Sequence, residues 1–187
     1  MSPRSSLLSS LASALSGAVR GALRTGSARG AGSRGRGRIE EAPPGRYGAD
    51  ATSEIDPRSI GPVRMTYHPS RDGDPDPGEI VWTWVPFEEN DGRGKDRPVL
   101  VVAAEQGPAG RTPTVLAVQL TSRDHSGDAD FVAIGAGSWD GEHRPSWVNI
   151  DRVMRVHPTG MRREAAALDE ASYARVEAAL RRRYGWQ

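Results

Sequence analysis

GEIVWTWVPFEENDGRGKDRPVLVV, residues 78–102, contains two apolar runs joined by a long charged segment. Apolar Ile, Val and Trp fill all but one of positions 80–85, which is typical of a strand buried on both faces or nearly so. The second run, PVLVVAA at 98–104, is rich in β-branched residues. A hairpin needs only about two to five loop residues, so the eleven residues from Pro86 to Asp96 indicate a loop retained for another purpose.

Further short apolar runs follow, separated by Gly, Pro and polar residues. They are TVLAVQLTS at 114–122, DFVAIG at 130–135, SWVNI at 146–150 and RVMRV at 152–156. Strands of this length and spacing favour a small β-barrel over a parallel sheet with crossover helices. GMRREAAA, 160–167, is interpreted as a helical turn that leads into the C-terminus.

The C-terminal sequence predicts a helix with both ends marked. Asp169 is a suitable N-cap, and apolar residues recur at helical spacing from Tyr173 to Tyr184. Gly185 stands where a C′ glycine is expected. Arginines at 181–183 fall in the last turn, where positive charge interacts favourably with the helix dipole. The predicted fold class is therefore mainly β with a C-terminal helix.

The composition divides the chain into a basic tail and a mildly acidic body. Residues 1–38 contain seven Arg and no Asp or Glu, whereas residues 76–187 contain fourteen Lys or Arg against seventeen acids. The Ser/Gly/Arg-rich tail cannot bury enough apolar surface to fold, so a long disordered N-terminal region is expected. A weak amphipathic helix over 6–25 stays open, as do an RNA-contacting arm and a solvated linker over 26–38. Residues 39–75, rich in Pro, Gly and acids, are predicted to be a linker.

Several function classes are excluded or made less favourable. The sequence contains no cysteine, which excludes disulfides and thiolate metal sites and suits a cytoplasmic location. No apolar run approaches the roughly 18 residues that a membrane-spanning helix needs. There is no Gly-rich phosphate loop and no HExxH motif. DHSGDAD, 124–130, gathers one His and three Asp, but acidic loops of this kind are usually solvated, so neither a metal nor another cofactor is expected.

Arg97 is the residue to which the sequence assigns chemistry most clearly. The following Pro98 excludes the helical region for Arg97, and a proline is best tolerated at the beginning of a strand. The side chain should therefore project from a rigid strand edge, and its guanidinium could bind a phosphate through two parallel hydrogen bonds. A structural ion pair with Glu88, Asp91 or Asp96 is the alternative. Likewise, the hydroxyls of Thr121 and Ser122 at the end of the third run either orient a phosphate or ribose or cap the next turn.

Taken together, these features resemble the PemK/MazF family of toxin endoribonucleases. The resemblance rests on PGEIVWTWVP, RPVLVV, LAVQLTS and WVNIDRVMRV, in this order and followed by the capped helix. It spans residues 76–187 and implies a small SH3-like barrel that works as a homodimer. It further implies metal-independent cleavage of single-stranded RNA at short sequences and inhibition by the C-terminal segment of an antitoxin. DNA would be contacted only indirectly, through that antitoxin.

The resemblance carries the family's arginine onto Arg97 and its strand-end threonine onto Thr121. The family's loop glutamate is not matched, because the stretch before Arg97 reads EENDGRGKD and the nearest position is Gly92. The acid–base partner stays open among Asp91, Glu89 and His125. RNA contacts are expected from Arg93, Lys95, Ser122, Arg123 and Trp139.

The expected reaction is attack of a ribose 2′-OH on the adjacent phosphorus. Arg97 would stabilise the negative charge that develops on the phosphoryl oxygens, and Thr121 would bind one non-bridging oxygen. Two alternatives remain, because a fold does not fix a function. One is a non-catalytic barrel that binds protein or nucleic acid, like toxins of this fold that poison gyrase. The other is a domesticated family member whose basic tail is the working part.

Overall fold

In the computed structural model, residues 42–70, 72–105 and 113–187 are described, and they form one antiparallel sheet with a C-terminal helix. The strands are β1 (Ser53–Ile55), β2 (Glu79–Pro86), β3 (Gly94–Glu105), β4 (Thr114–Thr121), β5 (Phe131–Gly135), β6 (Ser146–Val156) and β7 (Met161–Ala167). A short 3-10 turn, η1 (Pro158–Gly160), precedes β7, and α1 (Glu170–Tyr184) follows it. The predicted fold class, mainly β with a C-terminal helix, is confirmed. The predicted tail, 1–38, lies outside the described residues.

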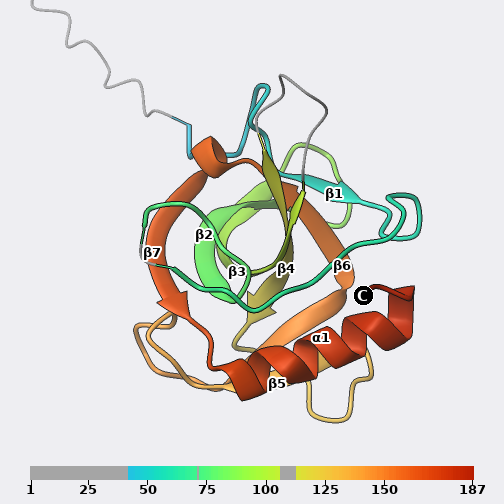
Figure 1. Cartoon of the computed structure of the whole chain (residues 1–187). Helices are drawn as coiled ribbons and strands as arrows, with labels where there is room; N and C mark the ends of the chain where they lie inside the picture. The colour runs from blue at the N-terminus through green and yellow to red at the C-terminus, as the bar shows by residue number, and fades with distance from the viewer. Residues whose placement is uncertain (1–41, 71, 106–112) are drawn as a thin grey trace, which may run out of the picture. The chain divides into compact units, whose positions relative to one another are not determined.

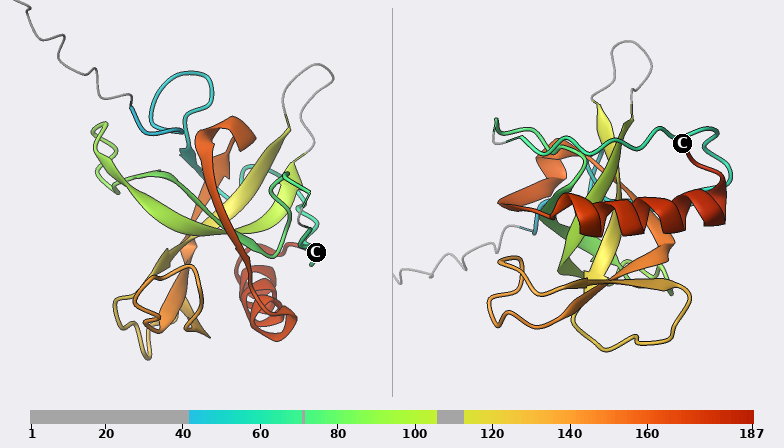
Figure 2. Two further views of the ribbon diagram at one scale, coloured as in Figure 1. Left: turned by 90° about the vertical axis from the view of Figure 1, so that its left-hand side faces the viewer. Right: turned by 60° about the horizontal axis from the view of Figure 1, so that its bottom comes forward.

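The strands surround a central core. Their order is β1-β6-β4-β3-β2-β7, and β5 pairs with β6 beside this path. Every strand pair is antiparallel. Figure 1 looks into the resulting barrel, with α1 lying across its lower side next to β5. The two views in Figure 2 show the same helix packed on the outside of the barrel wall.

Alternation along the strands produces two apolar clusters. One contains only strand residues, among them Val81, Val85, Val99, Val101, Ala117 and Met154. The other joins strands to the helix, through Ile80, Leu100, Leu116, Tyr173, Val176 and Leu180. Because β2 and β3 contribute to both clusters, each is apolar on both faces, which explains the nearly continuous apolar runs that opened the sequence analysis.

The ends of α1 are formed by the residues that the sequence predicts. The Asp169 carboxylate accepts a hydrogen bond from the backbone N–H of Ser172 at 2.8 Å. Gly185 has a φ of 73°, and its N–H donates to the carbonyl of Arg181. Between these caps, Tyr173 is almost fully buried and its hydroxyl donates to the carbonyl of Val102 at 2.8 Å. The helix is therefore attached to β3 by a hydrogen bond as well as by apolar packing.

The predicted helical turn at 160–167 is wrong. Residues 161–167 form β7, which pairs with β2 from Thr83↔Met161 to Glu79↔Ala167. Pairing satisfies the backbone groups along the outer edge of β2, and this requirement outweighs the helix propensity of three consecutive alanines. The two runs predicted at 146–150 and 152–156 are also one continuous strand, β6.

The segment predicted as a linker, 39–75, differs from the structure over the part that is described. Its β1 pairs with β6 through Ser53↔Arg155, Glu54↔Met154 and Ile55↔Val153. Further along, Val63 and Met65 are buried in the core. Isolated apolar residues between prolines and glycines give no period, although each can fill a gap in a core that other strands create. The prediction of mostly irregular backbone agrees with the structure, but the prediction of an unpacked linker does not, because part of this segment is paired with β6 and part is buried in the core.

A buried pair of hydroxyls ties this segment to the barrel. The Thr83 hydroxyl donates to the carbonyl of Gly160 at 2.8 Å. Since its proton is used in that bond, the Thr83 oxygen accepts from the Thr52 hydroxyl, which lies 2.7 Å away. Gly45 packs against the same cluster with a φ of 77°, and the Thr52 N–H donates to its carbonyl at 2.8 Å. A Cβ on Gly45 would lie 2.6 Å from the Gly160 carbonyl oxygen, so only glycine fits there.

We expect Gly45→Ala to lower the free energy of unfolding by about 2–4 kcal/mol, because a left-handed φ and overpacking against backbone act together. Gly48→Ala is the matched control: its φ is 86°, and no atom lies within 4 Å of the added Cβ. It should cost only the backbone part, about 1–2 kcal/mol. Urea unfolding of both variants measures the difference. Equal losses would contradict the packing of this segment against η1 and β2.

Candidate functional site

Arg97 lies inside β3 rather than at its beginning. β3 starts at Gly94, which pairs with the last residue of β2, so the intervening loop consists of residues 87–93 only. The prediction that the strand starts at Pro98, after a loop of eleven residues, is therefore wrong. Proline is tolerated inside this strand because pairing between β3 and β4 begins only at Val99, which leaves Pro98 with one neighbouring strand. Arg97 is thus attached to a paired, rigid segment.

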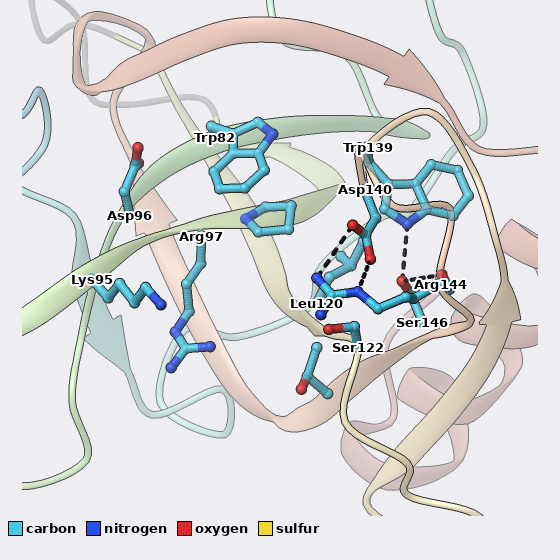
Figure 3. Close-up of a pocket in the computed structure, with 13 residues that line it drawn as sticks. Trp82, Lys95, Asp96, Arg97, Leu120, Ser122, Trp139, Asp140, Arg144 and Ser146 are labelled. Carbon is cyan, nitrogen blue, oxygen red and sulfur yellow. Dashed lines mark hydrogen bonds and ion pairs between the residues drawn. The ribbon is translucent and has the colours of Figure 1, made fainter. Parts of the chain in front are cut away.

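Arg97 and Thr121 face the same cavity. Val99 pairs with Gln119, and continuing this register by two residues puts Arg97 level with Thr121, the last residue of β4. Both line a cavity of about 230 Å³. In Figure 3 the Arg97 side chain points to the opposite side of β3 from Trp82. The structure therefore brings together the two residues to which the sequence assigned phosphate binding.

The Arg97 guanidinium is a half-buried charge without a counter-ion. Within the described part of the chain it makes no hydrogen bond and no ion pair. Burial, and secondarily the positive charge of Arg152 nearby, lowers the pKa of Arg97. A guanidinium nevertheless stays protonated in proteins, so the cost of burial remains as an unsatisfied charge. An anion that enters the cavity would relieve this cost.

Two of the three acids considered as structural partners of Arg97 are engaged elsewhere. Asp96 forms an ion pair with Arg162. Asp91 accepts from the Arg93 guanidinium at 2.7 Å, and its pKa is lowered by hydrogen bonds from the backbone and side chain of the same arginine. Glu88 lines a cavity beside Arg97 without an ion pair to it among the described residues. Arg97 therefore forms no ion pair with Glu88, Asp91 or Asp96, so the structure does not support the alternative of a structural ion pair at Arg97.

Thr121 performs the capping role that the sequence left open as an alternative. Its hydroxyl oxygen accepts from the backbone N–H of Arg123 at 3.2 Å. A hydroxyl that accepts one hydrogen bond still has its own O–H to donate. Capping and binding of a phosphoryl oxygen are thus compatible, because they use different parts of the same group.

Arg152 belongs to the site and was missed by the sequence analysis. It lies on β6, is only 8% exposed, and donates to Glu54 at 2.5 and 3.0 Å and to the Pro86 carbonyl at 3.0 Å. A second cavity, of about 360 Å³, is lined by Arg97 and Arg152 together with Pro86, Phe87, Glu88, Glu89, Arg93 and Gln119. An arginine inside the apolar run WVNIDRVMRV was the available signal, because a charge in such a strand needs a buried partner or a function.

Of the three acid–base candidates, Glu89 is brought near Arg97 and the other two are not. Glu89 lines the second cavity with Arg97. Asp91 lines neither of the two cavities and binds Arg93. The ring of His125 stacks on Phe131 with 3.5 Å between centroids, and His125 also lines neither cavity. Glu89 is therefore the one of the three candidates that shares a cavity with Arg97, and Glu88 lines the same cavity.

The predicted RNA-contacting residues divide in the same way. Lys95 and Ser122 line the first cavity and Arg93 lines the second, whereas Arg123 is exposed and lines neither. Trp139 also lines the first cavity, but it is only 8% exposed and its indole N–H donates to Ser146 at 3.1 Å (Figure 3). Its ring is held in the core and does not offer an open face, so the structure gives no support to base stacking by Trp139.

Neither a metal cluster nor a membrane span is found in residues 42–70, 72–105 and 113–187. No group of three or more His, Asp or Glu side chains in these ranges could hold a metal ion. The helix in these ranges, α1, is too short and too polar to cross a membrane.

The fold and the site define a small antiparallel barrel whose rim carries an uncompensated arginine between two cavities. The family profile described as "PemK-like, MazF-like toxin of type II toxin-antitoxin system" matches residues 76–183, and the chain belongs to this family. The resemblance noted from the sequence is thereby confirmed.

Among solved structures, the chain is similar to one titled "Crystal structure of MazE-MazF (Form-II) from Deinococcus radiodurans". The match has 26% sequence identity and a TM-score of 0.42, and it covers 59% of this chain and 96% of that chain. Comparison with curated proteins found no match.

We expect inorganic phosphate to bind at Arg97 and to stabilise the fold. At ten times the dissociation constant the gain is about 1.4 kcal/mol, which corresponds to a rise in Tm of about 3–6 °C. Arg97→Ala should abolish the rise, whereas Arg123→Ala, which removes an exposed charge outside both cavities, should keep it. Thermal unfolding in a phosphate titration measures this at constant ionic strength. A rise that survives in Arg97→Ala would place the anion elsewhere.

Proposed function

We propose that this toxin-family chain is an endoribonuclease that cleaves single-stranded RNA by attack of a ribose 2′-OH. One observation carries the proposal: the half-buried Arg97 guanidinium has no counter-ion in the described part of the chain and shares a cavity with the Thr121 hydroxyl. A phosphodiester supplies the missing negative charge and two oxygens in the geometry that a guanidinium binds best.

Arg97 and Thr121 would stabilise the charge that builds up during the reaction. The new bond joins the 2′-oxygen to phosphorus and the bond to the 5′-oxygen breaks, which leaves a cyclic phosphate and a free 5′-OH. Negative charge grows on the non-bridging oxygens at the pentavalent stage. A preorganised donor at such a position typically contributes about 3–4 kcal/mol. Arg152, fixed by Glu54, adds a second positive charge that needs no reorganisation.

The proton steps require a group other than Arg97. A guanidinium with a pKa above about 12 donates a proton at neutral pH only at high cost, so Arg97 acts as a clamp first and as a proton donor second. Glu89, which lines the second cavity with Arg97 and Glu88, is proposed as the base for the 2′-OH. Since Glu89 sits on the β2–β3 loop, its distance from the substrate depends on how that loop closes over the strand.

The charge distribution limits binding to this rim. The body of the protein, residues 76–187, has three more acids than bases, so it offers no general surface for nucleic acid. Lys95 lines the first cavity together with Arg97, and Arg93 lines the second together with Arg97. Binding should therefore be local, salt-sensitive and directed to a flexible single strand that can enter the cavities.

Partners follow from family membership rather than from contacts in this structure. We propose a homodimer whose RNA site is blocked by an antitoxin, with DNA contacted only through that antitoxin, in the cytoplasm.

Purified protein should cleave single-stranded RNA in EDTA, and Arg97→Ala should lose at least about a hundredfold in rate, because one charge-stabilising donor contributes about that much. Products with a cyclic phosphate and a 5′-OH, detected by end-labelling, would establish 2′-OH attack. Arg182→Ala removes an exposed charge from α1 and is the matched control. Undiminished cleavage by Arg97→Ala would remove Arg97 from the mechanism, and growth arrest with intact mRNA would favour the non-catalytic binder.

A further inference from the structure

We propose that Arg46, Tyr47 and Trp84 form a nucleotide-binding subsite that extends the RNA site beyond the part of the chain matched by the family. The inference rests on the proposed RNA substrate. Arg46 and Tyr47 precede the matched residues 76–183, so the subsite is an addition that this chain's own N-terminal segment makes to the barrel.

The first support is a stacked arrangement of a cation between two rings. The Arg46 guanidinium carbon lies 4.7 Å from the centroid of the Tyr47 ring and 4.5 Å from that of Trp84. Tyr47 is 62% exposed, and the other large hydrophobic side chains in the described part of the chain are partly or fully buried. An open aromatic face beside a planar guanidinium is the surface on which nucleic acid bases stack.

The second support is that the Arg46 guanidinium has unused hydrogen-bonding capacity. Its Nε is buried without a partner, and within the described ranges no hydrogen bond or ion pair of this side chain is found. Contact with two rings orients the group but satisfies none of its N–H donors. A phosphate or a base carbonyl would satisfy the terminal N–H groups, which, unlike Nε, are not buried.

The third support is continuity with the proposed active site. Arg46, Tyr47 and Trp84 line a third cavity, of about 220 Å³, whose wall also includes Pro86 and Arg93. Pro86 and Arg93 line the second cavity as well, and Arg97 is shared by the second and the first. The three cavities therefore adjoin in series, with a cation at each junction. A single strand bound at Arg97 would reach the Tyr47 ring by following Arg93.

The charges at this end of the series favour an RNA strand. Glu54 lines the third cavity, but its carboxylate is already paired with Arg152. Of the two cations that line this cavity, Arg46 forms no ion pair with a described residue, and Arg93 forms an exposed ion pair with Asp91. An acidic peptide would use these cations but would not need the open tyrosine face, whereas a nucleotide uses both. The segment is also held firmly, by the Thr52–Thr83 hydroxyl pair and the close packing of Gly45.

Binding of two 2′-O-methyl RNA pools of random sequence tests the subsite, because this modification removes the nucleophile. Pools of about 5 and about 14 nucleotides span the site sizes typical of single-strand-binding domains. Both Kd values are measured on the full chain by fluorescence anisotropy. The Kd of the short pool divided by the Kd of the long pool reports how much affinity the additional nucleotides contribute. Tyr47→Ala should reduce this ratio about tenfold, because one stacked base is lost. Arg46→Ala should reduce it similarly.

Controls separate stacking from folding and from net charge. Tyr47→Phe keeps the ring and should restore the ratio. Because Tyr47 is mostly exposed, Tyr47→Ala should leave the Tm unchanged, and an unchanged Tm would exclude unfolding as the cause of weaker binding. Arg182→Ala removes a charge as Arg46→Ala does but lies on α1, outside the three cavities. An equal loss in Arg182→Ala would indicate a general charge effect and overturn the subsite.

The result distinguishes this inference from the proposed function. RNA cleavage by the wild-type chain with a ratio unaffected by Tyr47→Ala would leave the nuclease standing and overturn the subsite. A Tyr47-dependent ratio without any cleavage would support the subsite and overturn the nuclease. A wild-type chain that binds neither pool would overturn both. If Tyr47→Ala instead weakened only the binding of an acidic poly-glutamate peptide, the surface would belong to a protein partner and the subsite would be overturned.

Discussion

The register between β2 and β3 is the constraint on which the rest of the structure depends. It places Thr83 opposite Arg97, so these two residues occupy the same face of the pair. Thr83 closes the barrel through Gly160 and Thr52, and Arg97 opens into the cavities at the rim. A slip by one residue would exchange the faces of the whole strand, removing the closure and the cation together. The close approach at Gly94, where a Cβ would lie 2.5 Å from the Val85 carbonyl oxygen, helps to fix this register.

Two neighbouring arginines with different partners explain how the rim can be stable and still attract an anion. Arg152 is nearly buried and is compensated by Glu54 and by the Pro86 carbonyl. Arg97 is half-buried and uncompensated, and the fixed charge of Arg152 makes the absence of a counter-ion more costly. The short strand β1 supplies Glu54, so a segment outside the family-matched region determines which of the two cations is free.

The sequence predicts most of the elements and few of their boundaries. Continuous β-branched runs and the Asp169 and Gly185 caps depend on local chemistry, and the structure shows the corresponding strands and helix ends. Pairing partners are not local, and this is why β7 was mistaken for a helical turn and β1 for part of a linker. The alanines of β7 prefer a helix in isolation, but the open edge of β2, some eighty residues earlier, decides their conformation.

The same distinction between local and distant chemistry applies to the site. Arg97 was identifiable because the following proline constrains its backbone, and Thr121 because it ends an apolar run. The candidate carboxylate could not be chosen from sequence, since Glu89 and Asp91 are two residues apart and only the turn of the loop sends one of them into the cavity with Arg97. Arg46 and Tyr47 carry no local signal at all. Their place in the proposed site depends on the hydrogen bond between Thr52 and Thr83, which attaches their segment to β2, where Arg46 contacts the ring of Trp84. The family profile therefore contains all the residues that line the first two cavities, whereas half of the residues that line the third, including Arg46 and Tyr47, precede the part of the chain that the profile matches.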